Sequence, residues 1–138
     1  SQQGQTPTFG VLTFKVLPGS PGSAISTEVM AAAAKILSQR STPTTRWYSD
    51  GQGSFTATVP RLTPKAITQY AEDLQATVLE QLPSLVEAES GEPNVAVGGA
   101  IADVSQATDG QQLIQTAEQA VETALQRGRN RVKISQLN

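Results

Sequence analysis

Apolar residues recur along the chain with two different periods, and each period predicts a kind of element. Nearly continuous apolar runs at 9–17 and 94–104 predict buried strands. Spacings of three and four residues predict three helices, each with one apolar face. The faces are, in order, Val29, Ala32, Ala33, Ile36 and Leu37; then Ile67, Ala71, Leu74, Val78 and Leu82; then Leu113, Ala117, Ala120, Val121 and Ala124.

Helix start and stop signals bound these three segments. The first helix begins at Ser26 or Thr27 and runs to about Gln39, and the second begins after Thr63 with proline at its first position. The third begins after Thr108 or Asp109, and Gly128 stands where a left-handed C-cap belongs.

The stretch RWYSDGQGSFTATV, residues 46–59, predicts a β-hairpin with strands 46–49 and 54–59 and a natural turn pair, Asp50-Gly51. Two interpretations fit its turn glycines, Gly51 and Gly53. In the first, the glycines only allow a tight turn; in the second, they also let the backbone lie close to a bound nucleotide. In the strand predicted at 94–104, Gly98 and Gly99 predict a bulge or a close neighbouring backbone.

With a last strand at 130–135, the order is β-α-β-β-α-β-α-β. The first six elements form the split βαβ pattern of ferredoxin-like folds, and a helix and a strand are added after them. We therefore expect an α+β fold with a mixed central sheet of about five strands. Residues 1–8 are polar and predict a linker or a remnant of protein production, so the domain is expected at 9–138 as a piece of a longer protein.

Composition narrows the chemistry that is available. The 138 residues carry 10 basic and 12 acidic side chains, a formal charge of −2, which gives no general attraction to nucleic acid or anionic lipid. The absence of cysteine and histidine excludes thiolate chemistry and a Ser-His-Asp triad. No apolar run reaches the ~18 residues of a membrane-spanning helix, and no signal peptide is visible, so we expect a cytoplasmic domain without a membrane.

The tail, TAEQAVETALQRGRNRVKI at 116–134, resembles the end of the GGDEF domains, the diguanylate cyclases. That family typically ends in a pattern such as A-D-x-A-L-Y-x-A-K-x-x-G-R-N, and Ala117 to Asn130 follow its spacing without a gap. VAVGGAIA at 95–102 is similar to a strand of that family, and the hairpin stands where the family has its signature Gly-Gly-Asp-Glu-Phe. The signature positions are Gly51, Gln52, Gly53, Ser54 and Phe55.

The resemblance implies a fold and an activity, the joining of two GTP molecules into cyclic di-GMP between two protomers. It also implies carboxylates for two Mg²⁺ ions, from the first strand and the signature turn. Here no Asp or Glu precedes Glu28, and Gly53 and Ser54 replace the signature acids, while Asp50 is out of register. Leu125 replaces the family's helix lysine, which leaves Arg129 as the one residual phosphate contact.

Two further family features are missing from the sequence. The Asn-Asp pair that reads guanine is absent from PGSPGSAISTE at 18–28, and the inhibitory R-x-x-D site is absent too, since Arg46 and Asp50 are spaced R-x-x-x-D. We therefore expect a degenerate GGDEF domain with no catalytic residues, no metal and no cofactor.

Other signals concern partners. Trp47 and Tyr48 fall on opposite faces of the hairpin, so one is expected in the core and the other at the surface. Together they are the candidate interface, with Trp47 as the expected anchor and simple packing as the alternative. The cluster Arg127, Arg129, Arg131 and Lys133 fits either a phosphate or nucleic-acid contact or a solvated helix end.

We interpret the chain as an inactive regulatory or protein-interaction domain of a signalling protein, with a protein partner or self-association. The alternatives are a non-catalytic sensor of GTP or cyclic di-GMP and a nucleic-acid-binding ferredoxin-like module. Nucleotide binding is doubtful on this interpretation, and no nucleic acid is expected.

Overall fold

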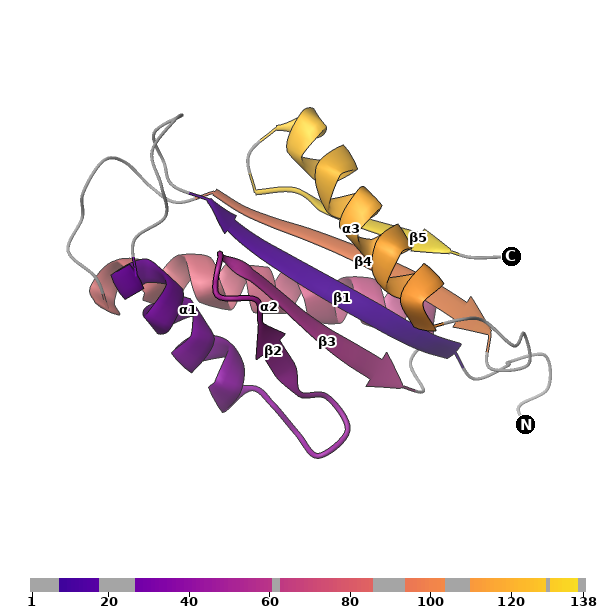
Figure 1. The fold of residues 1–138 in the computed structure, drawn as a ribbon, viewed down its shortest axis with the longest axis horizontal. Coiled ribbons are helices and arrows are strands. Elements are labelled where there is room, and N and C mark those ends of the chain that lie inside the picture. Colours follow the sequence, from indigo (N-terminus) through magenta and orange to yellow (C-terminus); the bar gives the residue numbers. More distant parts are fainter. Residues whose placement is uncertain are drawn as a thin grey trace.

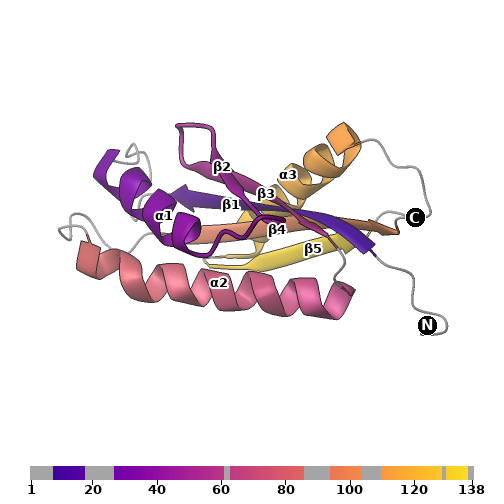
Figure 2. The same ribbon diagram turned by 90° about the horizontal axis from the view of Figure 1, so that it is seen from below.

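The protein folds as a five-stranded mixed sheet with helices on both faces (Figures 1 and 2). The computed structural model describes residues 8–17, 27–60, 63–85, 94–103, 110–128 and 130–136. The elements are β1 (Thr8–Leu17), α1 (Thr27–Gln39), β2 (Trp47–Ser49), β3 (Ser54–Pro60), α2 (Pro64–Leu85), β4 (Asn94–Asp103), α3 (Gly110–Arg127) and β5 (Val132–Gln136). The predicted α+β class and the order of elements are confirmed.

The strand order is β2-β3-β1-β4-β5, the ferredoxin-like arrangement with one strand added at the β4 edge. β1 is the central strand and pairs antiparallel with β3 and with β4. The last strand, β5, runs parallel to β4, as expected when a helix crosses over between them. None of the helices in the described ranges is long and apolar enough to cross a membrane.

The pleat of β1 separates two cores. Leu12, Phe14 and Val16 face α1 and α2 and belong to the larger cluster, together with the buried residues of those helices. Val11 faces the other side, where it packs against Ala100 and α3. The predicted inner faces of α2 and α3 are buried at every position named, and α1 is buried at Ala32, Ala33, Ile36 and Leu37.

The glycine pair of β4 makes a close approach and no bulge. Pairing continues unbroken through Gly98 and Gly99 on both neighbours, β1 and β5. A Cβ at Gly98 would lie 2.3 Å from the Val121 amide nitrogen and 2.4 Å from the Ala117 carbonyl oxygen. The backbone of α3 therefore rests directly on the backbone of β4, and no side chain larger than hydrogen fits between them.

Some boundaries differ from the predicted ones. β2 begins at Trp47 and not at Arg46, and β3 includes Pro60. This proline can end an antiparallel strand because the last residue needs no ladder hydrogen bond from its nitrogen. β5 begins at Val132 and not at Asn130, because Asn130 takes a left-handed conformation with φ 54° that no strand residue adopts.

Candidate functional site

The turn of the β2–β3 hairpin is built around the carboxylate of Asp50. Asp50 Oδ1 accepts hydrogen bonds from the amides of Gln52 at 2.7 Å and Ser54 at 3.0 Å. The Asp50 amide donates in turn to the Ser54 carbonyl oxygen at 3.0 Å, which closes the loop. One oxygen of this carboxylate therefore holds the turn together, as Asp side chains do in Asx turns.

The two turn glycines have different surroundings. Gly51 has φ 78° and Gly53 has φ 98°, a region that disfavours side chains, so both conformations favour glycine. Gly51 lies in open space, while Gly53 is buried and its carbonyl oxygen accepts from the Val16 amide at 2.9 Å. The glycines thus serve the geometry of the turn and its attachment to the end of β1.

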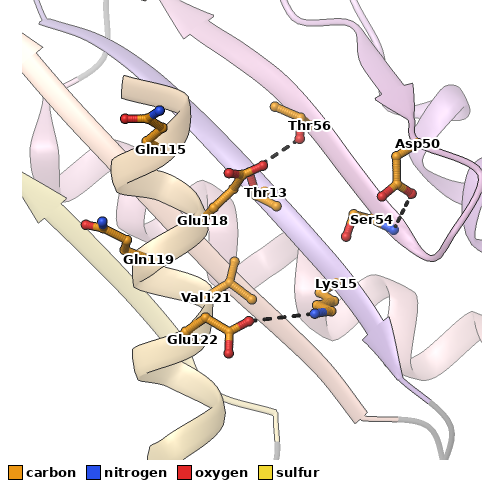
Figure 3. A pocket seen from close by; sticks show the side chains of 10 residues that line it. All are labelled: Thr13, Lys15, Asp50, Ser54, Thr56, Gln115, Glu118, Gln119, Val121 and Glu122. Carbon is orange, nitrogen blue, oxygen red and sulfur yellow. Dashed lines mark hydrogen bonds and ion pairs between the residues drawn. The ribbon is translucent and has the colours of Figure 1, made fainter. Parts of the chain in front are cut away.

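A groove lies between this hairpin and α3, over β1 (Figure 3). It has a volume of about 670 Å³ and is lined by Thr13, Lys15, Asp50, Ser54, Thr56, Gln115, Glu118, Gln119, Val121 and Glu122. Thr13 and Thr56 face each other across β1 and β3, with hydroxyl oxygens 3.4 Å apart, and Thr13 is buried. At the other end Lys15 Nζ lies 3.6 Å from Glu122 Oε2.

The lining of the groove is acidic. Three carboxylates, Asp50, Glu118 and Glu122, oppose the one ammonium of Lys15, so the formal charge of the lining is −2. Lys15 is itself paired with Glu122, which leaves little positive potential for an anion. The groove favours a neutral or cationic ligand over a phosphate.

Within the described ranges, no group of three or more Asp, Glu, His or Cys side chains could hold a metal ion. Pairs of Mg²⁺ ions that activate phosphates need several convergent oxygen ligands. Asp50 stands alone at the turn with one of its oxygens already taken by two amides. The described residues at this turn do not supply the set of carboxylates for the two-metal centre that the family resemblance implies.

The predicted phosphate contact, Arg129, lies outside the described residues. Gly128 has φ 133°, and its amide donates to the Leu125 carbonyl oxygen at 3.3 Å, as predicted for the end of a helix. Leu125 packs against the cluster of Ala96, Val121 and Ala124, so this position contributes apolar contact and no cation.

The asparagine of the tail has a structural role that sequence reasoning missed. Asn130 Oδ1 accepts from the Val95 amide at 2.8 Å, and the Asn130 amide donates to Asn94 Oδ1 at 2.7 Å. The buried Gln75 of α2 adds a hydrogen bond from Nε2 to the Val95 carbonyl oxygen at 2.8 Å. These bonds fasten the turn before β5 to the start of β4. The sequence offered one hint, because asparagine tolerates a positive φ better than most residues.

Trp47 and Tyr48 do lie on opposite faces, as predicted. The Trp47 ring packs edge-on against Phe14, with ring centroids 5.1 Å apart and an angle of 84°. Tyr48 is 67% exposed on the other face. Trp47 thus packs largely against the core, and Tyr48 is the member of the pair that is accessible to a partner. The interface role of the pair stays a prediction.

Tyr70 of α2 lies next to Trp47. Burial raises the pKa of the Tyr70 hydroxyl above its ordinary value, and the Trp47 indole N–H lowers that pKa in part. Nε1 of Trp47 is buried, yet it has no hydrogen bond of acceptable geometry within the described residues. The indole N–H of Trp47 and the hydroxyl of Tyr70 are therefore polar neighbours that form no hydrogen bond.

Comparisons with known proteins agree with this architecture. The family model for the diguanylate cyclase GGDEF domain matches residues 9–131. A comparison with curated proteins finds no match.

Solved structures of such domains are similar in fold. The GGDEF domain of DgcB from Caulobacter crescentus, solved with c-di-GMP, has a TM-score of 0.72 and 16% identity, over 92% of this chain and 75% of that one. The active GGEEF domain of a diguanylate cyclase from Vibrio cholerae has a TM-score of 0.73 and 15% identity, over 95% and 85%. The GGDEF domain of PA1120 from Pseudomonas aeruginosa has a TM-score of 0.70 and 16% identity, over 95% and 84%.

Proposed function

We propose that this chain, which belongs to the GGDEF family of diguanylate cyclase domains, has lost cyclase activity and works as a regulatory, protein-binding domain of a signalling protein. One observation carries the proposal. The positions that hold Mg²⁺ in the family resemblance have no carboxylates here, since nothing acidic precedes Glu28 and Gly53 and Ser54 replace the signature acids.

The local structure of the turn supports the loss of the metal site. Asp50 is the acid closest to the missing pair, and a compensating role would require its carboxylate to turn toward a metal ion. Oδ1 would then give up two backbone hydrogen bonds, each worth about 1 kcal/mol. One remaining carboxylate oxygen is too few for two hard cations that prefer six oxygen ligands each.

The surroundings of the turn also support weak nucleotide binding. Leu125 packs into an apolar cluster where the resemblance places a lysine, and the neighbouring groove carries a formal charge of −2. A triphosphate without its metal ions would meet repulsion along that groove. A non-catalytic sensor of GTP or cyclic di-GMP would therefore have to rely on cations away from this groove, such as Arg129.

Isothermal titration calorimetry tests the proposal and separates it from the sensor alternative. The domain is titrated with GTP and with cyclic di-GMP, each with Mg²⁺, up to about 1 mM, where a Kd in the millimolar range corresponds to about −4 kcal/mol. We expect no heat of binding from either nucleotide. A saturable heat that is lost in Arg129→Ala, but kept in the control Arg127→Ala, would favour the sensor and contradict a purely protein-binding role.

A further inference from the structure

The two faces of the sheet are unequally covered. On one face α1 and α2 share the larger core, whereas on the other α3 packs over β1 and β4 through Ala117 and Val121 (Figure 2). Among the described residues, no helix covers β2 and β3 on the α3 side. Two adjacent strands span about 10 Å, which is the width of one helix packed beside another. The described residues therefore leave β2 and β3 open next to α3, over a width that one helix would fill.

The floor of this space is a row of side chains set by the strand register. Tyr48 lies opposite Thr56, and Thr56 lies opposite Thr13, so the three share the uncovered face. Thr13 and Thr56 of this row line the groove described above, together with Lys15 and the two acidic side chains of α3, Glu118 and Glu122 (Figure 3). Tyr48 lies next to Thr56, beyond the lining.

The exposed large hydrophobic side chains of the described residues are Tyr48 and Ile114, at 67% and 40%. Tyr48 stands on the strand side of the groove. Ile114 precedes Glu118 by one turn of α3, and its direction falls between those of Val121 and Glu118, which both line the groove. Neither side chain is part of the groove lining, but each neighbours it, Tyr48 beside Thr56 of β3 and Ile114 one turn before Glu118 of α3. Both are therefore placed to contact apolar anchors of a partner that lies in the groove.

The negative charge of the groove lining indicates a partner with basic side chains. Asp50, Glu118 and Glu122 give the groove a formal charge of −2, which attracts basic side chains and repels phosphates. A second copy of this chain does not offer a basic helix within the described ranges. The charged side chains exposed on α2 are Lys65, Glu72, Asp73 and Glu80, and those on α3 include Glu118 and Glu122.

We propose that this groove is the docking site for a basic amphipathic helix of a partner protein. The helix lies beside α3 over β3 and β2, its apolar anchors contact Tyr48 and Ile114, and its Lys or Arg side chains meet Glu118, Glu122 and Asp50. This inference rests on the proposed function, because it names the surface that a protein-binding domain would use.

Two 18-residue helical peptides serve as probes, with identical leucines at helical spacing. One carries Lys and Arg on its polar face, and the other carries Glu at the same positions. NMR titration of the ¹⁵N-labelled domain reports both affinity and location. We expect the basic peptide to bind with a Kd on the order of 10 to 100 µM, typical of small transient interfaces, with shifts confined to β2, β3 and the groove side of α3. The acidic peptide is expected to bind at least tenfold more weakly.

Two matched variants test the role of charge. Glu118→Lys reverses a charge of the groove, and Glu72→Lys makes the same change on α2, which packs on the opposite face; both side chains are exposed, so neither variant disturbs the core. We expect Glu118→Lys to weaken the basic peptide about tenfold and Glu72→Lys to change its affinity less than twofold. Ile114→Gln is expected to weaken both peptides about equally.

The docking proposal is overturned if the basic peptide fails to bind at 1 mM, if its shifts map to α1 and α2, or if the acidic peptide binds as well. It is equally overturned if Glu118→Lys and Glu72→Lys have the same effect. Formation of cyclic di-GMP by the domain would refute the proposed function without changing any of these binding results, so the two failures are distinguishable.

Discussion

Replacing Gly98 with alanine tests the direct contact between the backbones of α3 and β4. The new Cβ would lie 2.3 Å from the Val121 amide nitrogen and 2.4 Å from the Ala117 carbonyl oxygen. Ordinary van der Waals contact is about 3.4 Å or more, so the helix must move away by about 1 Å at Ala117 and Val121. Overpacking of this kind typically costs about 1 to 3 kcal/mol, while alanine in place of a strand glycine regains about 0.5 to 1 kcal/mol.

Gly99→Ala is the matched control. It lies in the same strand and gains the same backbone term, but its Cβ would meet mainly the ends of two flexible side chains, Ile134 Cδ1 and Leu12 Cδ2, both at 2.7 Å. Since those ends can rotate away, Gly99→Ala should be less costly. We expect Gly98→Ala to lower the free energy of unfolding by about 2 kcal/mol and Gly99→Ala by at least ~1 kcal/mol less.

Urea denaturation followed by circular dichroism measures both variants, with the midpoint compared at constant slope. The reasoning is refuted if Gly98→Ala is as stable as the unmodified domain, or if Gly99→Ala is the more damaging change. Either result would mean that α3 does not rest on the β4 backbone, and the wall of the groove would then need a different description.

Substitutions at three further residues test the hydrogen bonds and the half-buried hydroxyl of Tyr70. Asp50→Ala should lower the free energy of unfolding in urea by about 1 to 2 kcal/mol, because two turn amides lose their acceptor. Asp50→Asn keeps an acceptor oxygen and should lower it less. Equal losses in the two variants would contradict the role assigned to the carboxylate. Asn130→Ala should lower the free energy of unfolding by about 1 to 3 kcal/mol, because it loses the hydrogen bond to the Val95 amide and strains a positive φ. Asn130→Gly should remove the strain but not restore the hydrogen bond. A glycine variant as stable as the unmodified domain would therefore contradict the role of that bond. Because burial raises the pKa of Tyr70, its neutral form is favoured in the folded state, and the stability of the domain should fall as pH rises above about 10. The stability of the Tyr70→Phe variant should fall less steeply between pH 9 and 11. Parallel stability curves for the two proteins would show that this hydroxyl does not contribute.

Local patterns in the sequence predict the elements and their inner faces well. The five inward positions of α3, for example, are read directly from their spacing, because a helix that covers a sheet must bury one stripe. The same holds for Thr63, whose hydroxyl oxygen accepts from the Ala66 amide at 3.1 Å as a cap.

Features that join distant residues could not be predicted in this way. Three features depend on which strands pair and in which register. They are the hydrogen bond from the Asn130 amide to Asn94, the contact of Gly98 with α3, and the groove between Asp50 and Glu118. Glycines in a strand predicted either a bulge or a close backbone, and only the tertiary structure selects the second. Likewise Asp50 was recognised as a turn residue, but its two amide hydrogen bonds depend on the path of the whole loop.

The most direct test of the account is whether the purified domain forms cyclic di-GMP from GTP and Mg²⁺. The assay is run over protein concentrations up to about 100 µM, because the resemblance places each active site between two protomers, and an active GGDEF domain serves as positive control. The account predicts no product above the protein-free blank at any concentration, since β1 and the hairpin turn lack the carboxylates that two Mg²⁺ ions require. Product that increases with protein concentration and is abolished by EDTA would contradict it.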